Sequence, residues 1–492
     1  MKDLKLRVIR GGFAKIAAQA TTFVLRIGSL MVMARLLDPK DFGLVGMVTA
    51  FTGVLNLFRD FGLSTATVQR VHVTEEQIST LFWINILVGG ILWLSLTLAA
   101  PFLVTFYHEP NLFWVTVVLA TGFIFNAAGV QHSALLQRQM RFSALAIIDV
   151  ISLVLSIATS ISLAAAGFRY WALVAMSITP PFVTTICLWV ATSWIPGKPS
   201  RQAQIQSLMR FGGTITLNSI VVYIAYNFEK VLLGRFWGAE ALGIYSRSYQ
   251  LINIPTENLN SAVGEVAFSA LSRVQDDPIR LKSYFLKGYS LVLAITLPIT
   301  IAVALFSNDI ISVLLGPKWK DSALIFRLLA PTIMIFALIN PLSWLLMSFG
   351  LVKRSLNIAF VLAPLVMAGY ILGLPYGPKG VALAYSSVMT LWVIPHIAWC
   401  VKGTVISLGD ILRVVGRPLI SGIVAAAVAF GVQFVFGPSL SPLPRLVLGM
   451  GVLLVVYALM LLYVMGQKAV YLSLIQGFKK RAPVGEDALA SV

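Results

Sequence analysis

The chain has 492 residues, of which 58% are hydrophobic and only 11% charged, and its formal net charge is +18. Soluble domains usually contain about 25% charged residues, so this composition excludes a soluble domain and indicates a polytopic membrane protein. The basic residues concentrate in segments expected on the inner side of the membrane, so the positive charge reflects topology and not nucleic-acid binding.

Apolar stretches long enough to cross a bilayer recur along the whole chain. Each crossing needs about 20 helical residues, so we expect about 14 transmembrane helices. The predicted spans are residues 12–36, 41–69, 77–105, 111–131, 143–166, 170–193, 206–234, 241–270, 285–306, 322–348, 355–374, 379–400, 416–437 and 444–466. We expect the first span to be retained, because no small-residue cleavage site follows a short apolar core.

Two pairs of stretches indicate an internal repeat. MARLLDPKDFG at residues 33–43 and LGRFWGAEALG at residues 233–243 share an arginine and a glycine at an offset of 200. GFRYWALVAMS and GPKGVALAYSS match at an offset of 210. An even number of helices in each copy gives parallel repeats, which in transporters place the substrate site between the halves. Chance similarity among apolar helices is the alternative interpretation.

The repeat predicts an all-α fold of two parallel six-helix lobes around a central cavity, followed by two extra C-terminal helices. We expect an N-terminal lobe, a cytoplasmic interlobe linker, a C-terminal lobe that repeats the first, the two extra helices and a cytoplasmic tail. Their predicted bounds are residues 1–195, 196–205, 206–402, 403–466 and 467–492.

The first predicted span has a polar face with an arginine near its middle. On a helix, the polar side chains of this span fall within a sector of about 80°. They are Lys15, Gln19, Thr22, Arg26 and Ser29. A charge at the depth of Arg26 costs about 2.5 to 3.5 kcal/mol on insertion scales, so it must face protein or water. Arg26 is therefore either a cavity cation or a member of a structural ion pair.

The seventh span, the repeat partner of the first, carries a similar stripe. Its members are Thr216, Ser219, Tyr223, Tyr226 and Lys230. Lys230 either lines the same cavity or reaches the membrane interface along its aliphatic stem. Two further spans contribute cations, since Arg59 lies beside Asp60 on the second span and Arg247 lies on the eighth, which is the most polar.

Acidic residues within the spans nearly balance the cations, so charge counting alone does not define an anion-binding cavity. These acids are Asp60, Asp149, Glu229, Glu257 and Glu265. Asp60, Asp149, Glu257 and Glu265 are the candidates for carrying a coupling H⁺ or Na⁺, with ion pairs to arginine as the alternative. The cysteines and histidines have no metal-ligand spacing, and no nucleotide-binding motif occurs, so we expect neither a metal site nor direct use of ATP.

A family resemblance is carried by three stretches, ARLLDPKDFGLVGM from Ala34, FRDFGLSTATVQR from Phe58 and TLFWINILVGG from Thr80. They resemble the polysaccharide-transporter branch of the multidrug/oligosaccharidyl-lipid/polysaccharide exporter superfamily, in particular colanic-acid and lipopolysaccharide-type flippases. The resemblance implies alternating access and a lipid-linked oligosaccharide substrate. It assigns the anionic head of that substrate to Arg26, Arg59 and Arg247. It also implies that the last two helices shelter the lipid tail.

From these observations we expect a flippase or exporter of a polyprenyl-pyrophosphate-linked oligosaccharide. The predicted substrate-binding residues are Arg26, Arg59, Arg247, Lys230, Gln19, Thr22, Tyr223 and Tyr226. A drug or organic-cation antiporter is the main alternative, and a polysaccharide polymerase or lipid-linked glycosyltransferase is the enzymatic one; we expect no enzyme, because no soluble region is present. We expect a monomer in the bacterial inner membrane with both termini cytoplasmic, in contact with membrane lipids and with polymerase and export machinery, and with no nucleic acid partner.

Overall fold

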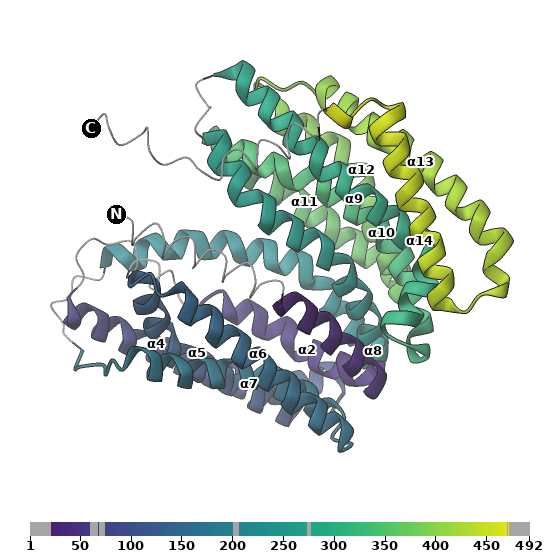
Figure 1. Cartoon of the computed structure of the whole chain (residues 1–492). Coiled ribbons are helices and arrows are strands. Elements are labelled where there is room, and N and C mark those ends of the chain that lie inside the picture. Colours follow the sequence, from purple (N-terminus) through teal and green to yellow (C-terminus); the bar gives the residue numbers. More distant parts are fainter. Residues whose placement is uncertain are drawn as a thin grey trace. The chain divides into compact units, whose positions relative to one another are not determined.

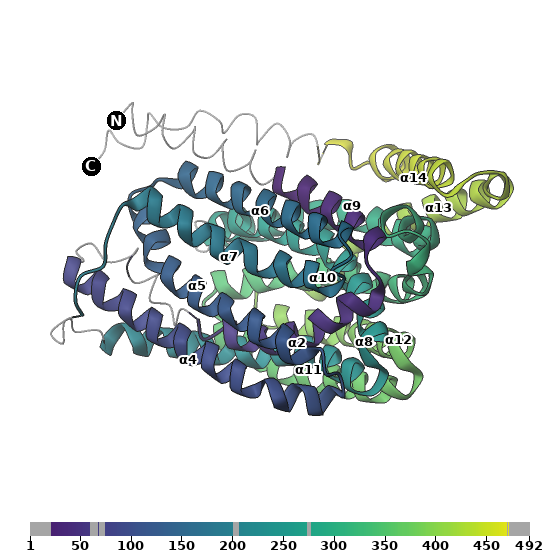
Figure 2. The same ribbon diagram turned by 90° about the horizontal axis from the view of Figure 1, so that it is seen from below.

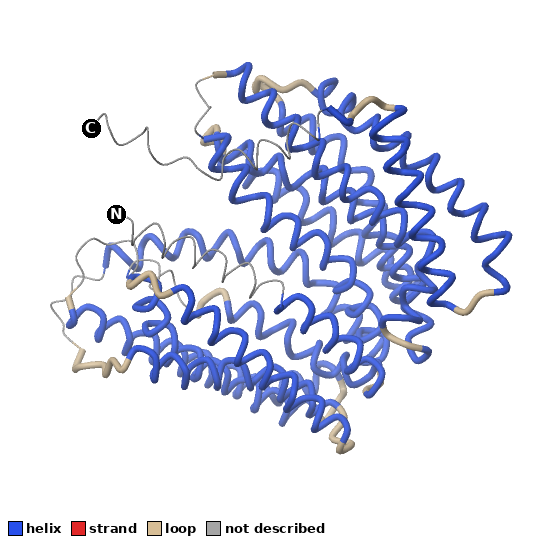
Figure 3. The backbone as a smooth tube through the Cα atoms, in the orientation of Figure 1, coloured by secondary structure: helices blue, strands red, loops and turns tan. Residues whose placement is uncertain are grey.

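The computed structural model describes residues 21–59, 67, 74–199, 206–272, 277–469 and 471, without the side chains of residues 206–222, 258–270, 272, 352 and 438. Within these ranges every regular element is a helix, so the all-α prediction is confirmed for the described chain (Figure 3). A helix over residues 21–36 precedes the labelled ones.

Figure 1 labels the helices in the order in which they follow one another along the chain. In the first part of the chain they are α2 (Pro39–Asn56), α4 (Glu75–Tyr107), α5 (Leu112–Arg138), α6 (Phe142–Ala165), α7 (Tyr170–Thr192) and α8 (Gln206–Ser272). In the second part they are α9 (Pro278–Leu314), η1 (Pro317–Trp319), α10 (Lys320–Ser348), α11 (Val352–Gly373), η2 (Leu374–Tyr376), α12 (Gly377–Val401), α13 (Leu408–Phe436), η3 (Gly437–Ser439), α14 (Pro442–Leu459) and the π-helical η4 (Met460–Val464).

Two long helices contain a backbone break. In α8, Gly238 has φ +80°, a left-handed conformation that glycine adopts without a side-chain clash, so two helices meet there. In α9, Phe306 departs from helical geometry with φ −107° and ψ 19°. The break in α8 falls between the two spans predicted at residues 206–234 and 241–270.

Among the described residues, nine helical segments are long and apolar enough to cross a membrane. They confirm a polytopic membrane protein, and the number of fourteen helices stays a prediction. The single continuous helix predicted over residues 41–69 is wrong, because α2 ends at Asn56. There Leu57, Phe58 and Arg59 donate their backbone N–H groups to carbonyls three residues earlier, which tightens the chain into turns.

The chain divides into two compact units. Unit 1 comprises Met1–Ser246, Leu314–Trp319 and Val366–Val381, and unit 2 comprises Arg247–Val313, Lys320–Leu365 and Ala382–Val492. The predicted lobes, 1–195 and 206–402, remain a prediction. In unit 1, α5 packs against α4 and α7, and α7 packs against α6 (Figure 2).

Small residues let the helices of unit 1 approach closely, as is common in membranes where packing replaces the hydrophobic effect. A Cβ added to Gly89 of α4 would lie 2.5 Å from Cβ of Ala127 on α5. Between α5 and α7, Thr185 Oγ1 donates to the backbone carbonyl of Phe125 at 2.6 Å, and Trp189 Nε1 donates to that of Ala128 at 2.9 Å. These bonds fix α5 between its two neighbours.

In unit 2, α13 and α14 are held on α9 by an apolar cluster and a buried ion pair. Phe306 packs with Ala425 of α13 and Leu453 of α14. Beside this cluster, Asp309 accepts a hydrogen bond from Arg445 Nε at 3.0 Å and another from Gln433 Nε2 at 3.1 Å. The Asp309 side chain is only 5% exposed, so the paired arginine compensates the cost of burying its charge.

The two repeat-related motifs cross each other within unit 1. A Cβ added to Gly43 of α2 would overlap the carbonyl oxygen of Ala239 in α8, and a Cβ added to Gly243 would overlap that of Pro39. The two contacts are reciprocal at the offset of 200 residues that the sequence indicates, which is the contact expected of a pseudo-two-fold pair. This crossing supports the repeat interpretation.

Candidate substrate-binding residues

Arg26 projects from the helix over residues 21–36, and its side chain is exposed. The acid within electrostatic range of Arg26 is Asp149 on α6, which is also exposed. Thr22, one turn earlier on the same helix, is half-buried. The structure therefore places Arg26 within electrostatic range of one predicted coupling acid and leaves its side chain exposed.

Arg59 lies just after the end of α2 and reaches α5. Its Nη1 donates to Asn126 Oδ1 at 3.3 Å, and Asn126 Nδ2 in turn donates to the carbonyl of Gly122 at 2.9 Å. The buried Arg59 Nε has no hydrogen-bond partner among the residues that the structure describes. A guanidinium carries five N–H donors, so Arg59 retains capacity for an anionic group.

Further polar side chains of α5 continue from Asn126 and were not among the predicted site residues. Thr67 Oγ1 donates to Gln131 Oε1 at 3.1 Å, and Arg138 Nη1 donates to the carbonyl of Thr67 at 2.9 Å. His132 Nδ1 lies 2.7 Å from Thr192 Oγ1. The sequence shows these polar residues within an apolar span. It does not show their hydrogen-bond partners, which depend on how α5 packs.

Of the predicted polar stripe on the first helix of α8, the structure describes the side chains of Tyr223, Tyr226 and Lys230. Lys230 Nζ donates to Asn227 Oδ1 at 2.7 Å, and Asn227 Nδ2 donates to the carbonyl of Tyr223 at 2.9 Å. Tyr226 is half-buried on the same stretch. The Tyr223 phenol fits against α2 because position 53 is glycine, where an added Cβ would overlap the phenol oxygen.

Unit 2 holds the remaining described candidates. Arg247 Nη1 donates to Gln250 Oε1, one turn later on α8. Glu257 is exposed on the same helix. Gln19, Asp60 and the side chain of Glu265 lie outside the described residues.

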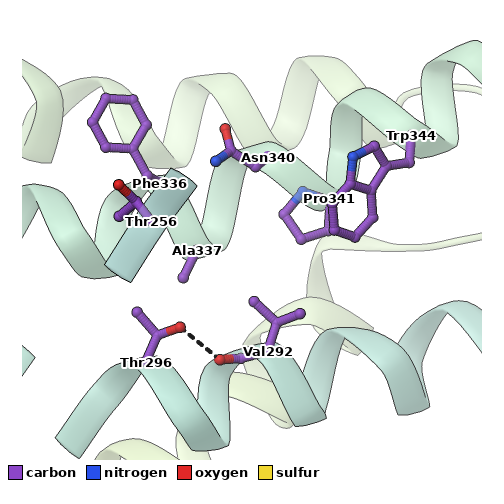
Figure 4. A pocket seen from close by; sticks show the side chains of 8 residues that line it. All are labelled: Thr256, Val292, Thr296, Phe336, Ala337, Asn340, Pro341 and Trp344. Atoms are coloured by element: carbon purple, nitrogen blue, oxygen red, sulfur yellow. Dashed lines mark hydrogen bonds between the residues drawn. The ribbon is translucent and has the colours of Figure 1, made fainter. Parts of the chain in front are cut away.

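A small pocket in unit 2 lies among α8, α9 and α10, close to Glu257. Its lining residues are Thr256, Val292, Thr296, Phe336, Ala337, Asn340, Pro341 and Trp344 (Figure 4). The Thr296 hydroxyl is already bonded to the carbonyl of Val292 at 2.7 Å and the Thr256 hydroxyl to that of Asn253 at 2.9 Å, so Asn340 and Trp344 supply the remaining polar side chains that line this space. None of the eight was a predicted binding residue.

Several of the described membrane helices carry arginine, lysine or acidic side chains. Charged side chains within membrane spans mark substrate and ion pathways, so this arrangement is typical of a membrane transporter. Within the described ranges, no three His, Cys, Asp or Glu side chains gather as metal ligands. Residues 32–324 match the model of the family described as polysaccharide biosynthesis protein. The match covers more than half of the chain, which therefore belongs to that family.

Curated relatives have names from polysaccharide biosynthesis and transport. The chain is 25% identical over 395 residues to the lipopolysaccharide biosynthesis protein WzxC of Escherichia coli (strain K12), covering 78% of each protein. It is 30% identical over 296 residues to the teichuronic acid biosynthesis protein TuaB of Bacillus subtilis (strain 168), covering 59% of this chain and 61% of that protein. It is 24% identical over 315 residues to the succinoglycan biosynthesis transport protein ExoT of Rhizobium meliloti (strain 1021), covering 64% of each.

Solved structures with the same fold come from two groups of membrane proteins. The lipid II flippase MurJ in an inward closed conformation matches with a TM-score of 0.72 at 13% identity, over 90% of this chain and 98% of MurJ. An inward-facing multidrug resistance MATE family transporter of the MOP superfamily matches with a TM-score of 0.64 at 14% identity, over 79% of this chain and 97% of that one. At these identities the likeness concerns the fold.

Proposed function

We propose that the protein is a flippase that moves a polyprenyl-pyrophosphate-linked oligosaccharide across the bacterial inner membrane by alternating access. The observation that carries the proposal is the accessible guanidinium of Arg26 on a membrane helix of a polysaccharide biosynthesis family member. The names of relatives that act in lipopolysaccharide and succinoglycan biosynthesis support it, as does the fold shared with a lipid II flippase.

The chemistry of such a substrate matches the described side chains. A pyrophosphate and several sugars lose their hydration in hydrocarbon, whereas the polyprenyl tail can stay in the lipid. Arg26 and Arg59 stay charged and can each offer paired N–H donors to phosphate oxygens. Tyr223, Tyr226 and Lys230 add hydroxyl and ammonium groups for the sugars. Arg247, Gln19 and Thr22 complete the proposed binding set.

The same proposal places both termini in the cytoplasm, couples transport to H⁺ or Na⁺, and assigns no catalytic step to the protein. Polysaccharide polymerase and export machinery would receive the flipped substrate. A drug or organic-cation antiporter is the second candidate, because a multidrug transporter shares the fold. Cation binding would require an acidic cavity, whereas the described part of the first span carries Arg26 and no acid between residues 21 and 37.

Purified protein in liposomes separates the two candidates. The liposomes receive a short-chain lipid-pyrophosphate oligosaccharide in one assay and a cationic dye in a parallel assay. We expect the oligosaccharide to become accessible on the opposite leaflet only when protein is present, and the dye distribution to stay unchanged. Movement of the dye without movement of the oligosaccharide would overturn the flippase proposal and support the antiporter.

A further inference from the structure

Glu229 is a fully buried acid on the first helix of α8, and it was not among the predicted coupling residues. Its exposed fraction is 0%, and neither carboxyl oxygen has a hydrogen-bond partner among the described residues. A buried, unpaired carboxylate costs several kcal/mol, so such a group takes up a proton instead of carrying its charge. Glu229 is therefore a group whose charge depends on how the surrounding helices are arranged.

The parts of α8 on either side of Glu229 pack against uncharged parts of α2 and α4, and the cation that acts on its charge is Lys230, next to it on α8. On one side of it in sequence, Tyr223 packs at Gly53 of α2; on the other, Gly234 packs at Met47 of α2 and at Tyr107 of α4. Glu229 thus lies in sequence between two contacts that hold α8 against α2, and about 120 to 140° around the helix from both of them. Residues 42–56 of α2 and 77–106 of α4 contain no charged side chain.

Among the described residues, the titratable groups that interact electrostatically with Glu229 are Lys230 and Tyr223 on its own helix. The neighbouring cation is already engaged, because Lys230 Nζ donates to Asn227 Oδ1 at 2.7 Å. A sodium ion would need several oxygen ligands, whereas neither Glu229 oxygen has a hydrogen-bond partner among the described side chains. A proton needs only one carboxyl oxygen, so the setting suits H⁺.

We propose that Glu229 is a proton-binding site that couples proton movement to the transport cycle. In the described conformation a proton occupies one carboxyl oxygen, and it leaves to water when the helices that cover Glu229 separate enough to admit solvent. Reprotonation then favours the return of Glu229 to its buried setting. The coupling to substrate rests on the proposed flippase function, whereas the proton binding itself does not.

Infrared difference spectroscopy of the purified full-length protein tests proton binding without any substrate. Wild type is compared with Glu229→Gln and with Glu240→Gln, which changes an exposed acid of α8 just after the break at Gly238. We expect a carbonyl band of a protonated carboxyl group to persist at pH values where exposed carboxylates are ionised. The band should be lost in Glu229→Gln and kept in Glu240→Gln. An unchanged band in Glu229→Gln would overturn the proposal.

Flipping of the short-chain lipid-pyrophosphate oligosaccharide in liposomes tests coupling. A pH gradient should accelerate flipping by wild type, by Glu240→Gln and by Glu229→Asp, which keeps an acid, and Glu229→Gln should lose the acceleration. A Glu229→Gln protein that responds to pH as wild type does would overturn the proposal. If Glu229→Gln keeps the acceleration by a pH gradient and loses only a response to a sodium gradient, the site binds Na⁺ instead of H⁺. If wild type flips nothing, the flippase function fails, and the infrared result still decides whether Glu229 binds a proton.

Discussion

At the scale of single residues, the sequence predicts the surroundings of Arg26 but not its neighbours. The cost of an unpaired charge in hydrocarbon predicts from sequence that Arg26 must face protein or water. The structure adds that Arg26 is exposed and lies within electrostatic range of Asp149, a residue 123 positions away on α6 that the sequence could not pair with it. The same holds for Arg59, whose bond to Asn126 depends on the packing of α5 and not on any local pattern.

Substitution of Arg26 tests its role in binding. Loss of a charge-assisted hydrogen bond costs about 1.5 to 3 kcal/mol, or about 10- to 150-fold in affinity. We therefore expect Arg26→Ala to abolish or strongly reduce surface polysaccharide, and Arg26→Lys to keep part of it because the charge remains. The measurements are surface polysaccharide and the amount of the protein in the membrane.

The matched control for Arg26 is Arg280→Ala. Arg280 is an exposed arginine in the first turn of α9, where it pairs with Asp277 at 3.2 Å. Since exposed ion pairs contribute little to stability, we expect this variant to export normally. Normal export by Arg26→Ala at normal protein level would remove Arg26 from the binding site.

At the scale of elements, composition and apolar periodicity predict the helices well but not their ends or contacts. The spans predicted at residues 143–166 and 170–193 agree closely with α6 and α7, because apolar runs bounded by glycine and polar residues define them. The end of α2 at Asn56 was missed, since its turns depend on local hydrogen bonds within an apolar stretch. The sequence shows that Gly43 and Gly243 match, but it does not show that each packs against the helix that carries the other.

The crossing of α2 and α8 makes a specific prediction about Gly43. Its missing side chain lets the Ala239 carbonyl pass, and a backbone group cannot move aside as a flexible side chain can. We expect Gly43→Ala to destabilise the protein by about 1 to 3 kcal/mol, the usual cost of overpacking. The readout is the fraction that stays monodisperse after heating in detergent. Gly90→Ala on α4 is the control, because nothing lies within 4 Å of an added Cβ there. Equal behaviour of the two variants would contradict a tight crossing.

At the scale of the whole molecule, the sequence predicts an all-α polytopic protein, and its motifs identify the family. What it does not reveal is which distant segments share a compact unit. Leu314–Trp319 lies in unit 1, where Trp319 is fully buried and donates from Nε1 to the carbonyl of Ala34 at 2.8 Å. In the same place Lys318 Nζ lies 2.8 Å from Asp38 Oδ1. These contacts join residues predicted to belong to different lobes.

If the predicted lobes, and not the compact units, move against each other during alternating access, the contact between Asp38 and Lys318 opens during each cycle. In a background without the native Cys187 and Cys400, Asp38→Cys and Lys318→Cys together allow this contact to be closed by a short bifunctional thiol reagent. We expect the cross-link to stop oligosaccharide flipping in liposomes, and a cleavable reagent to restore flipping after reduction.

The control for the cross-link is the pair Lys40→Cys and Glu109→Cys. It replaces a 3.6 Å ion pair between residues that both belong to the predicted N-terminal lobe. A link there should leave flipping intact, because two points within one lobe keep their distance as the lobes move against each other. Flipping that continues through the link between positions 38 and 318 would mean that this contact stays closed throughout transport. The moving boundary would then have to lie elsewhere in the protein.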